Sequence, residues 1–174
     1  MVAPSMVGRP LESAVWAALH DVHDPEIPTI SVVDLGVVRT VETGPNSVRV
    51  ELLPTFVGCP ALEVMRSAVA ERLRDFATNV RVEISFAEPW TSERITTEGR
   101  RRLRYSGFAP PTLRAESAVR DDRALPILPT LPVAECPYCG SRNTTLENAF
   151  GPTACRAIYH CTDCRQPFEQ FKEV

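Results

Sequence analysis

The chain has 174 residues, enough for one domain of medium size and a second, small one. Its formal net charge of -3 excludes a global basic field that would recruit nucleic acid or an anionic membrane. No apolar run approaches the roughly 20 residues of a membrane span, and residues 1–16 lack the features of a secretory signal. We therefore expect a cytoplasmic protein with reduced thiols and with neither a nucleic-acid nor a membrane partner.

The first part of the chain predicts a helix followed by a β-hairpin. Residues 9–22 carry apolar side chains at helical spacing and end at an Asp-Pro pair. Two segments of alternating polarity, 36–43 and 48–54, flank the turn sequence GPNS. Alternation of this kind is typical of strands with one buried face.

Three further elements are expected before the chain changes character. Residues 59–76 have the strongest helical pattern, with a single apolar stripe. Residues 79–86 alternate again and predict a third strand. A weaker helix follows, with Thr91 or Ser92 as its N-cap and Gly107 as its end.

This order of elements predicts an α+β fold for residues 1–107, a small sandwich with helices on one face of a sheet. Residues 108–133 contain five prolines and predict an extended linker. Residues 134–174 are rich in cysteine and predict a separate, small β ribbon domain stapled by a metal. The first domain's core is expected to draw on ten apolar side chains: Trp16, Leu19, Val38, Val50, Leu52, Leu62, Val69, Leu73, Val82 and Ile84.

The cysteines of the tail have the spacing of a metal site. Cys136 and Cys139 form one pair and Cys161 and Cys164 another, each with a two-residue gap that lets both thiolates face one ion. Four thiolates make a closed structural zinc site. A single iron or an iron–sulfur cluster also takes four thiolates, so iron remains an alternative to zinc.

The rest of the tail contains three expected strands and two further residues that could bind a metal, Cys155 and His160. Residues 143–150, 156–160 and 167–171 are the expected strands. Cys155 is interpreted as a small buried residue, with an additional metal ligand as the alternative. His160 could replace a ligand, but four cysteines already have the required spacing.

Cys59 stands apart from the other five cysteines. If the helix begins at Pro60, the favoured first position for proline, Cys59 occupies its N-cap. Thiol pKa falls at helix N-termini, and the thiolate is both nucleophile and metal ligand. A buried cysteine retained for its size is the alternative.

A loop rich in carboxylates could meet Cys59 at one edge of the sheet. It contains Asp24, Glu26 and Asp34, stiffened by two prolines. These residues could also serve as ordinary turn residues, with Gly36 allowing a tight turn. A cysteine beside two or three carboxylates could hold iron weakly or pass on a cluster.

Two motifs carry a resemblance to a known family. The sequence "DPEIPTISVVDLGVV" followed by "TFVGCPALEVM" resembles the SufT-type iron–sulfur assembly domain family. The tail from "CPYCG" to "EQFK" and the stretch "EPWTSERITTEGRRRLRYSGFAPP" resemble its PaaD-type members, phenylacetate-degradation proteins with an added cysteine-rich end. The resemblance covers roughly residues 10–172.

The resemblance implies an accessory protein, not an enzyme, for the multicomponent phenylacetyl-CoA epoxidase. Its partners would be the epoxidase subunits, either the di-iron oxygenase or the reductase with a ferredoxin-type cluster. The implied cofactors are zinc in the tail and iron or an iron–sulfur cluster held transiently at Cys59. The family positions fall on Asp24, Glu26, Asp34, Gly36, Thr55, Cys59 and Pro60, and the tail adds Cys155 to its four ligands.

Other functions stay open. The chain could be a structural subunit of the epoxidase complex, or a thiol enzyme that uses Cys59 as a nucleophile. Binding of nucleic acid by the tail ranks last, because acidic side chains match its basic ones. The chain could also form homo-oligomers, although no apolar stripe demonstrates this.

Overall fold

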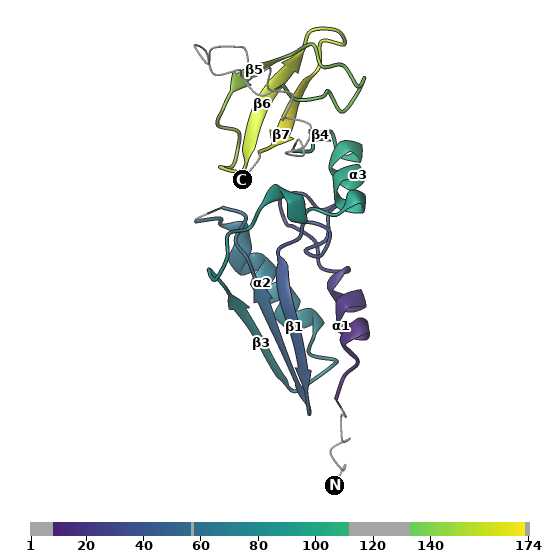
Figure 1. Ribbon diagram of the computed structural model, residues 1–174, viewed down its shortest axis with the longest axis vertical. Coiled ribbons are helices and arrows are strands. Elements are labelled where there is room, and N and C mark those ends of the chain that lie inside the picture. The colour runs from purple at the N-terminus through teal and green to yellow at the C-terminus, as the bar shows by residue number, and fades with distance from the viewer. Residues whose placement is uncertain (1–8, 57, 112–132, 173–174) are drawn as a thin grey trace, which may run out of the picture. The chain divides into compact units, whose positions relative to one another are not determined.

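The computed structural model describes three stretches of the chain: residues 9–56, 58–111 and 133–172. They belong to two compact units. The first unit comprises the chain up to residue 90 together with 94–99, and the second comprises 91–93 and the chain from residue 100 onward. The α+β fold class is confirmed, with a mixed first unit and a second unit built on a β-sheet (Figure 1).

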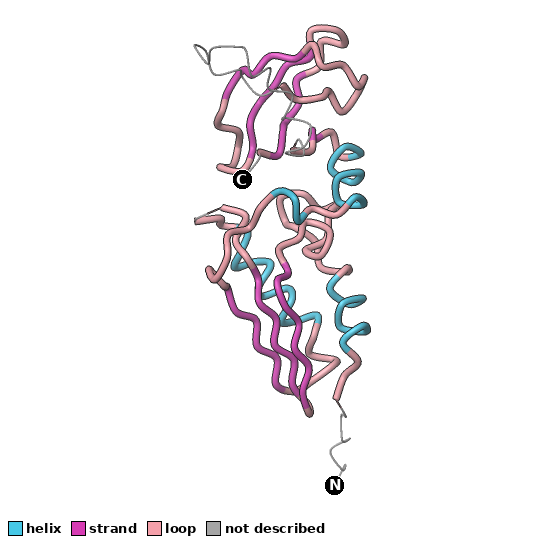
Figure 2. Tube along the Cα trace, in the orientation of Figure 1, coloured by secondary structure: helices cyan, strands magenta, loops and turns pink. Residues whose placement is uncertain are grey.

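A three-stranded sheet forms the centre of the first unit, in the order β1-β2-β3. Strands β1 (Val38–Gly44) and β2 (Ser47–Leu52) form the expected antiparallel hairpin. Strand β3 (Asn79–Ile84) pairs parallel to β2. A parallel pair needs a long crossover, and helix α2 (Ala61–Arg72) lies between these two strands in the sequence. Figure 2 shows the three strands of this sheet side by side in magenta. Helix α1 (Glu12–Leu19) precedes the hairpin.

The two faces of this sheet differ in polarity. Helix α1 contacts β1 and α2, and α2 contacts β3, so both helices cover the same side. Val48, Val50 and Leu52 are buried on that side. The intervening side chains form ion pairs on the other face: Arg49 lies 2.8 Å from the carboxylate of Glu83, and Arg39 lies 2.5 Å from that of Glu51.

Eight of the ten expected core residues are buried, and two are not. Trp16 is half-buried on α1, with its indole Nε1 donating to Glu12 Oε1 at 3.3 Å. Ile84 is half-buried because β3 has a neighbour on one side only. The tryptophan of the core is instead Trp90, which is 2% exposed and donates to the carbonyl of Leu35 at 3.1 Å.

The loop between α1 and β1 is itself part of the core. Backbone hydrogen bonds fix its conformation: Asp24 N donates to Ile30 O at 3.0 Å, and Val32 N donates to Val22 O at 2.9 Å. The apolar side chains of the loop are almost fully buried: Ile27, Ile30, Val32, Leu35 and Val37. The carboxylates of this loop are therefore attached to a fixed backbone.

The helix expected from residue 91 begins later. A 3-10 turn, Ser92–Arg94, comes first, and helix α3 spans Thr97–Tyr105. The predicted cap at Thr91 or Ser92 is wrong: Thr96 Oγ1 accepts the amide of Gly99 at 2.9 Å and caps α3. The predicted end is confirmed, since Gly107 follows the helix with a φ of 84°.

The carboxylate of Asp34 joins two parts of the first unit that lie 62 residues apart. The side chain is 6% exposed, and its Oδ2 accepts the hydroxyl of Ser31 at 2.8 Å. Its Oδ1 accepts the hydroxyl of Thr96 at 2.9 Å, and its backbone carbonyl accepts the amide of Thr96 at 3.0 Å. His20 Nδ1 lies 3.7 Å from Oδ2.

The second unit holds a four-stranded sheet in the order β4-β7-β6-β5. The three expected tail strands are present as β5 (Thr144–Asn148), β6 (Arg156–Cys161) and β7 (Pro167–Phe171). Strand β4 (Phe108–Ala109) pairs with β7 and consists of the first two residues of the expected linker. Residues 112–132 of that linker lie outside the described part of the chain.

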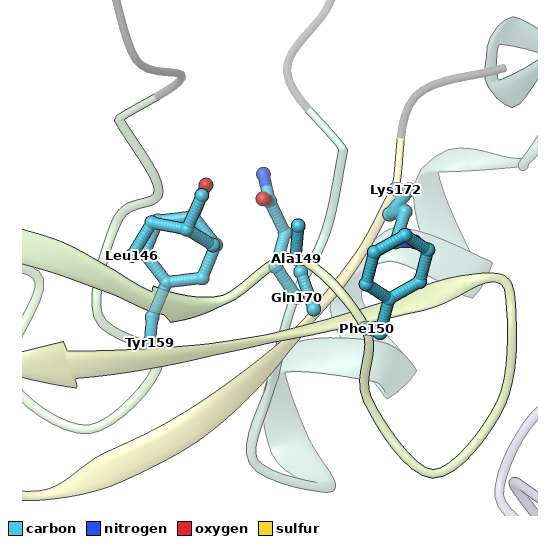
Figure 3. A pocket seen from close by; sticks show the side chains of 7 residues that line it. Leu146, Ala149, Phe150, Tyr159, Gln170 and Lys172 are labelled. Carbon is cyan, nitrogen blue, oxygen red and sulfur yellow. The ribbon is translucent and has the colours of Figure 1, made fainter.

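The core of the second unit is small. Tyr159 stacks on Phe168 with ring centroids 5.7 Å apart. Over the described residues, one buried cluster contains seven residues, three of them alanine: Ala109, Ala134, Cys136, Ala157, Tyr159, Cys161 and Phe168. Leu103 and Phe171 are also buried in this unit. A core of this size rarely stabilises a domain without a further cross-link. Two residues of the cluster, Cys136 and Cys161, could supply that cross-link by binding a metal ion. Beside the aromatic pair, a hollow is lined by residues that include Leu146, Tyr159 and Gln170 (Figure 3).

Replacing the buried carboxylate should destabilise the first unit. In Asp34→Ala the hydroxyls of Ser31 and Thr96 lose a charged acceptor, so the free energy of unfolding should fall by about 3 kcal/mol. Urea unfolding of the full chain measures this. The matched control is Asp21→Ala, whose exposed ion pair with Arg72 should contribute about 1 kcal/mol or less. Equal losses in the two variants would contradict the role given to Asp34.

Two glycines with similar backbone angles allow a test of steric fit. Gly36 has a φ of 71°, and a Cβ there would lie 2.3 Å from the carbonyl oxygen of Arg94. Gly58 has a φ of 81°, and a Cβ there would meet nothing within 4 Å. Gly58→Ala should therefore cost about 1 kcal/mol from backbone strain alone. Gly36→Ala should lower the free energy of unfolding by at least about 2 kcal/mol more than Gly58→Ala does. Urea unfolding of both variants measures the difference.

Candidate functional site

The four paired cysteines of the tail come together in the structure. The Sγ atoms of Cys136, Cys139, Cys161 and Cys164 all lie within 4.8 Å of one another. Cys136 Sγ is 3.6 Å from Cys164 Sγ, and Cys139 Sγ is 3.6 Å from Cys161 Sγ. Four sulfurs at about 2.3 Å from a central zinc would be about 3.8 Å apart at the corners of a tetrahedron. The geometry therefore fits a four-thiolate metal ion.

Each cysteine pair sits on the same kind of backbone turn. Gly140 N donates to Cys136 O, and Arg165 N donates to Cys161 O, both at 2.9 Å. The first cysteine of each pair then donates its own amide to the residue five positions later, at 2.9 Å for Cys136 and 3.0 Å for Cys161. Gly140 and Arg165 have φ values of 73° and 60°. We call these two turns the first and second knuckle, residues 136–141 and 161–166.

The knuckle environment acts in opposite directions on two of the thiols. The backbone N–H of Cys164, followed by that of Asp163, hydrogen-bonds Cys161 and lowers its pKa to about 7. Burial raises the pKa of Cys164 to about 12. A cysteine binds a metal ion as the thiolate. Burial disfavours the thiolate of Cys164, and the positive charge of a bound ion would stabilise it.

Cys155 and His160 are not part of the four-sulfur group. Cys155 is 7% exposed, and its Sγ lies 3.2 Å from Thr153 Oγ1. Its carbonyl accepts the amide of Lys172 at 2.9 Å. His160 lies on β6, where it pairs with Pro167 of β7. The observed placement of Cys155 matches a small buried residue beside the ribbon.

Cys59 lies on the loop that follows β2 and leads into α2. It is half-buried, its amide donates to Phe56 O at 3.2 Å, and its carbonyl accepts the amide of Leu62 at 3.3 Å. The N-cap of α2 is Pro60, so the prediction of Cys59 at the N-cap was wrong by one residue. Thr55, on the same loop, is buried. The carboxyl ends of neighbouring parallel strands, as here after β2, are where open α/β sheets place ligand-binding loops.

Two of the three carboxylates of the loop between α1 and β1 accept hydrogen bonds that fix their position. Asp24 Oδ1 accepts the amides of Glu26 at 2.7 Å and Ile27 at 3.0 Å. Asp34 accepts the hydroxyls of Ser31 and Thr96. Glu26 is half-buried. Over the described residues, the tail cysteines are the one group of three or more metal-ligating side chains, so these carboxylates and Cys59 do not form a second group.

Two residues that fix this loop from a distance have no signature in the sequence. Trp90 and Arg94 both bond to backbone carbonyls of the 35–36 turn, at 3.1 and 3.0 Å. Their partners lie more than fifty residues earlier, and no local pattern identifies such pairs.

In the described part of the chain, every helix is too short or too polar to cross a membrane.

Two family models match the chain, one for each of its parts. The model for "Iron-sulfur cluster assembly protein" matches residues 12–86. The model for "PaaD zinc beta ribbon domain" matches residues 128–172. The first match contains Cys59 and the carboxylate loop, and the second contains all four clustered cysteines.

Relatives extend these matches. A crystal structure of a domain of unknown function, DUF59, from Bacillus anthracis is 27% identical and covers 53% of this chain and 90% of its own, with a TM-score of 0.50. An iron-sulfur cluster carrier protein from Mycobacterium tuberculosis (strain H37Rv) is 34% identical over 95 residues, which are 54% of this chain but 24% of that protein.

One relative matches almost the whole length. An Escherichia coli (strain K12) protein is 37% identical over 167 residues, covering 95% of both chains. Its name describes it, as a provisional assignment, as a subunit of 1,2-phenylacetyl-CoA epoxidase. With this identity over both parts and with the PaaD ribbon in place, the chain belongs to the PaaD family of phenylacetyl-CoA epoxidase proteins.

Proposed function

We propose that this chain is an accessory protein that helps to assemble an iron–sulfur cluster or iron centre in phenylacetyl-CoA epoxidase. The match to the assembly family and the name of the Escherichia coli relative support this proposal. The client is the oxygenase or the ferredoxin-type reductase subunit, and the chain is not itself the catalyst. It acts in the cytoplasm, where its six free thiols stay reduced.

The observation that carries the proposal is the position of Cys59. It is the cysteine that lies outside the four-sulfur group and is still partly accessible, since Cys155 is only 7% exposed. Its loop follows a strand end in the part of the chain that matches the assembly family. A thiolate there can ligate iron transiently and release it, because no other cysteine of the first unit competes for the ion.

The neighbouring polar residues shape this loop region. Asp24 caps its own turn through two amides, and Asp34 fixes the turn that precedes β1. Thr55 is buried at the start of the Cys59 loop. Glu26 is the carboxylate of the set that is neither buried nor fully exposed, and so it is the one best able to face an incoming ion.

The ribbon is a docking module that zinc holds together. The four-sulfur group has the donor set and spacing of a closed zinc site, and the core of the unit is too small to suffice alone. Cys136, Cys139, Cys161 and Cys164 would hold the ion. When bound, zinc supplies structural cross-linking and no redox chemistry.

Metal analysis tests the ribbon assignment. Protein purified without air should contain about one zinc per chain and no acid-labile sulfide. Cys139→Ser should lose the zinc and the amide protection of β6 and β7. Cys155→Ser is the matched control and should keep both, because Cys155 lies outside the group. Stoichiometric iron with sulfide in the tail would contradict the zinc assignment.

Substitution of Cys59 tests the assembly role. Cys59→Ser should leave the urea unfolding midpoint and the zinc content unchanged, because the side chain is half-buried and is not one of the tail ligands. Epoxidase produced together with this variant should contain less iron or cluster and show at least about tenfold lower activity, since even groups that only orient a metal ligand change affinity or activity by about 10- to 100-fold.

Cys155→Ser again serves as the control and should support full epoxidase activity. A Cys59→Ser variant that yields fully loaded, fully active epoxidase would refute the role of Cys59. It would leave the zinc assignment intact, since that depends on separate residues.

A stable structural subunit is the second candidate function, and the word "subunit" in the name of the Escherichia coli relative favours it. Co-purification with the other epoxidase subunits at a fixed ratio, independent of Cys59, would support this function. An assembly factor should instead leave the mature enzyme after loading it.

A further inference from the structure

An acidic side chain inside the second knuckle bonds to the segment that leaves the first. Asp163 lies between the ligands Cys161 and Cys164 in the sequence. Its Oδ2 accepts the hydroxyl of Ser141 at 2.5 Å, and its Oδ1 accepts the side-chain amide of Asn143 at 2.9 Å. One carboxylate therefore joins the two knuckles.

Backbone bonds reinforce this connection. Thr162 donates to the carbonyl of Asn143 twice, from its amide at 3.0 Å and from its hydroxyl at 2.6 Å. Ser141 also caps its own turn by accepting the amide of Asn143 at 2.9 Å. We call the four bonds between 141–143 and 162–163 the knuckle clasp. None of these four bonds involves a ligand sulfur, so the clasp joins the two cysteine pairs through groups other than the metal ligands.

The charge of Asp163 makes its position informative. Zinc bound by four thiolates carries a net charge of about -2, so a further carboxylate beside it is electrostatically unfavourable. Solvent weakens this repulsion, since Asp163 is exposed. A neutral side chain would avoid the repulsion but could not accept from both Ser141 and Asn143 with two equivalent oxygens.

We propose that Asp163 is a positioning residue for the tail metal site, which holds the two cysteine pairs at ligand separation and thereby slows the loss of the ion. This inference rests on the zinc part of the proposed function and is independent of Cys59. Groups that orient metal ligands commonly change metal affinity by about 10- to 100-fold. Asp163 acts on the separation of the knuckles rather than on a ligand atom.

The test measures the rate at which the zinc-loaded full chain gives up zinc to an excess of a colorimetric chelator. Asp163→Ala should release zinc at least about tenfold faster. Ser141→Ala, which removes one bond of the clasp and the cap of its own turn, should have a smaller effect. Glu147→Gln is the charge control, an exposed acid on β5 of the same unit, and should release zinc at the original rate.

Two comparisons separate positioning from charge repulsion and from general stability. If repulsion by the carboxylate dominated, both Asp163→Ala and Asp163→Asn would release zinc more slowly, which would overturn the proposal. If Asp163 acted only through general stability, a ribbon-core variant such as Phe168→Leu would release zinc equally fast at the same loss of melting temperature, which would also overturn it.

The double variant Ser141→Ala with Asp163→Ala completes the test. Its release rate should be clearly below the product of the two single effects, because both substitutions break the bond between Ser141 and Asp163. Fully multiplicative effects would show that the two residues act independently and would contradict the clasp. If Asp163→Ala fails to hold zinc at all, the same comparison is made with Ser141→Ala and Asn143→Ala, which leave the carboxylate in place.

If zinc is absent from the purified tail, the proposed zinc assignment fails by itself, and metal analysis reveals this before any release experiment. If zinc is present and Asp163 has no effect on its release, only the positioning inference fails. The two failures are therefore distinguishable.

Discussion

The first unit depends on one buried carboxylate and the hydroxyl groups that bond to it. Asp34 is almost fully buried, so its charge needs hydrogen-bond donors within the protein. Ser31 supplies one from the same loop, and Thr96 supplies another from beyond β3. Thr96 also caps α3, so one side chain fixes the start of that helix and attaches it to the loop that contains Asp34. The carboxylate loop therefore belongs to a fixed frame rather than to a flexible surface.

The two units reach stability by different physical means. The first buries long apolar side chains on one face of a sheet under two helices, and its polar outer face is covered by ion pairs. The second, over its described residues, buries few large apolar side chains: the aromatic pair, Leu103 and Phe171. Cross-linking by four thiolates at a metal replaces the missing apolar burial. The four clustered cysteines therefore lie in the second unit, and Cys59 lies apart from them in the first.

Much of this arrangement follows from short-range sequence patterns. The alternation of Val48, Val50 and Leu52 predicts their buried face, and the two-residue gaps between cysteines predict their convergence. Both depend on spacing within a few residues. Trp90 could not be predicted as a core residue, because its environment comes from a turn 55 residues earlier. Helicity in 91–96 was predicted wrongly because Thr96 bonds to Asp34, and this distant partner determines where α3 begins. Cys59 and the carboxylates of the loop between α1 and β1 do not form one group of ligating side chains among the described residues, so the sequence pattern did not predict their separation.

The two knuckles have the same backbone hydrogen bonds but differ in the residue that takes the left-handed conformation in each turn. Gly140 adopts its left-handed conformation without penalty, whereas Arg165 has a side chain that makes the same conformation unfavourable by about 1 kcal/mol. The second turn is therefore the weaker half of the site when no ion holds it. Loss of metal should be uneven, with amide exchange rising first at Arg165 and Gln166, the part of the second turn that the clasp does not bind. Residues 162–163 would stay attached to the first turn, so an arriving ion would meet both cysteine pairs.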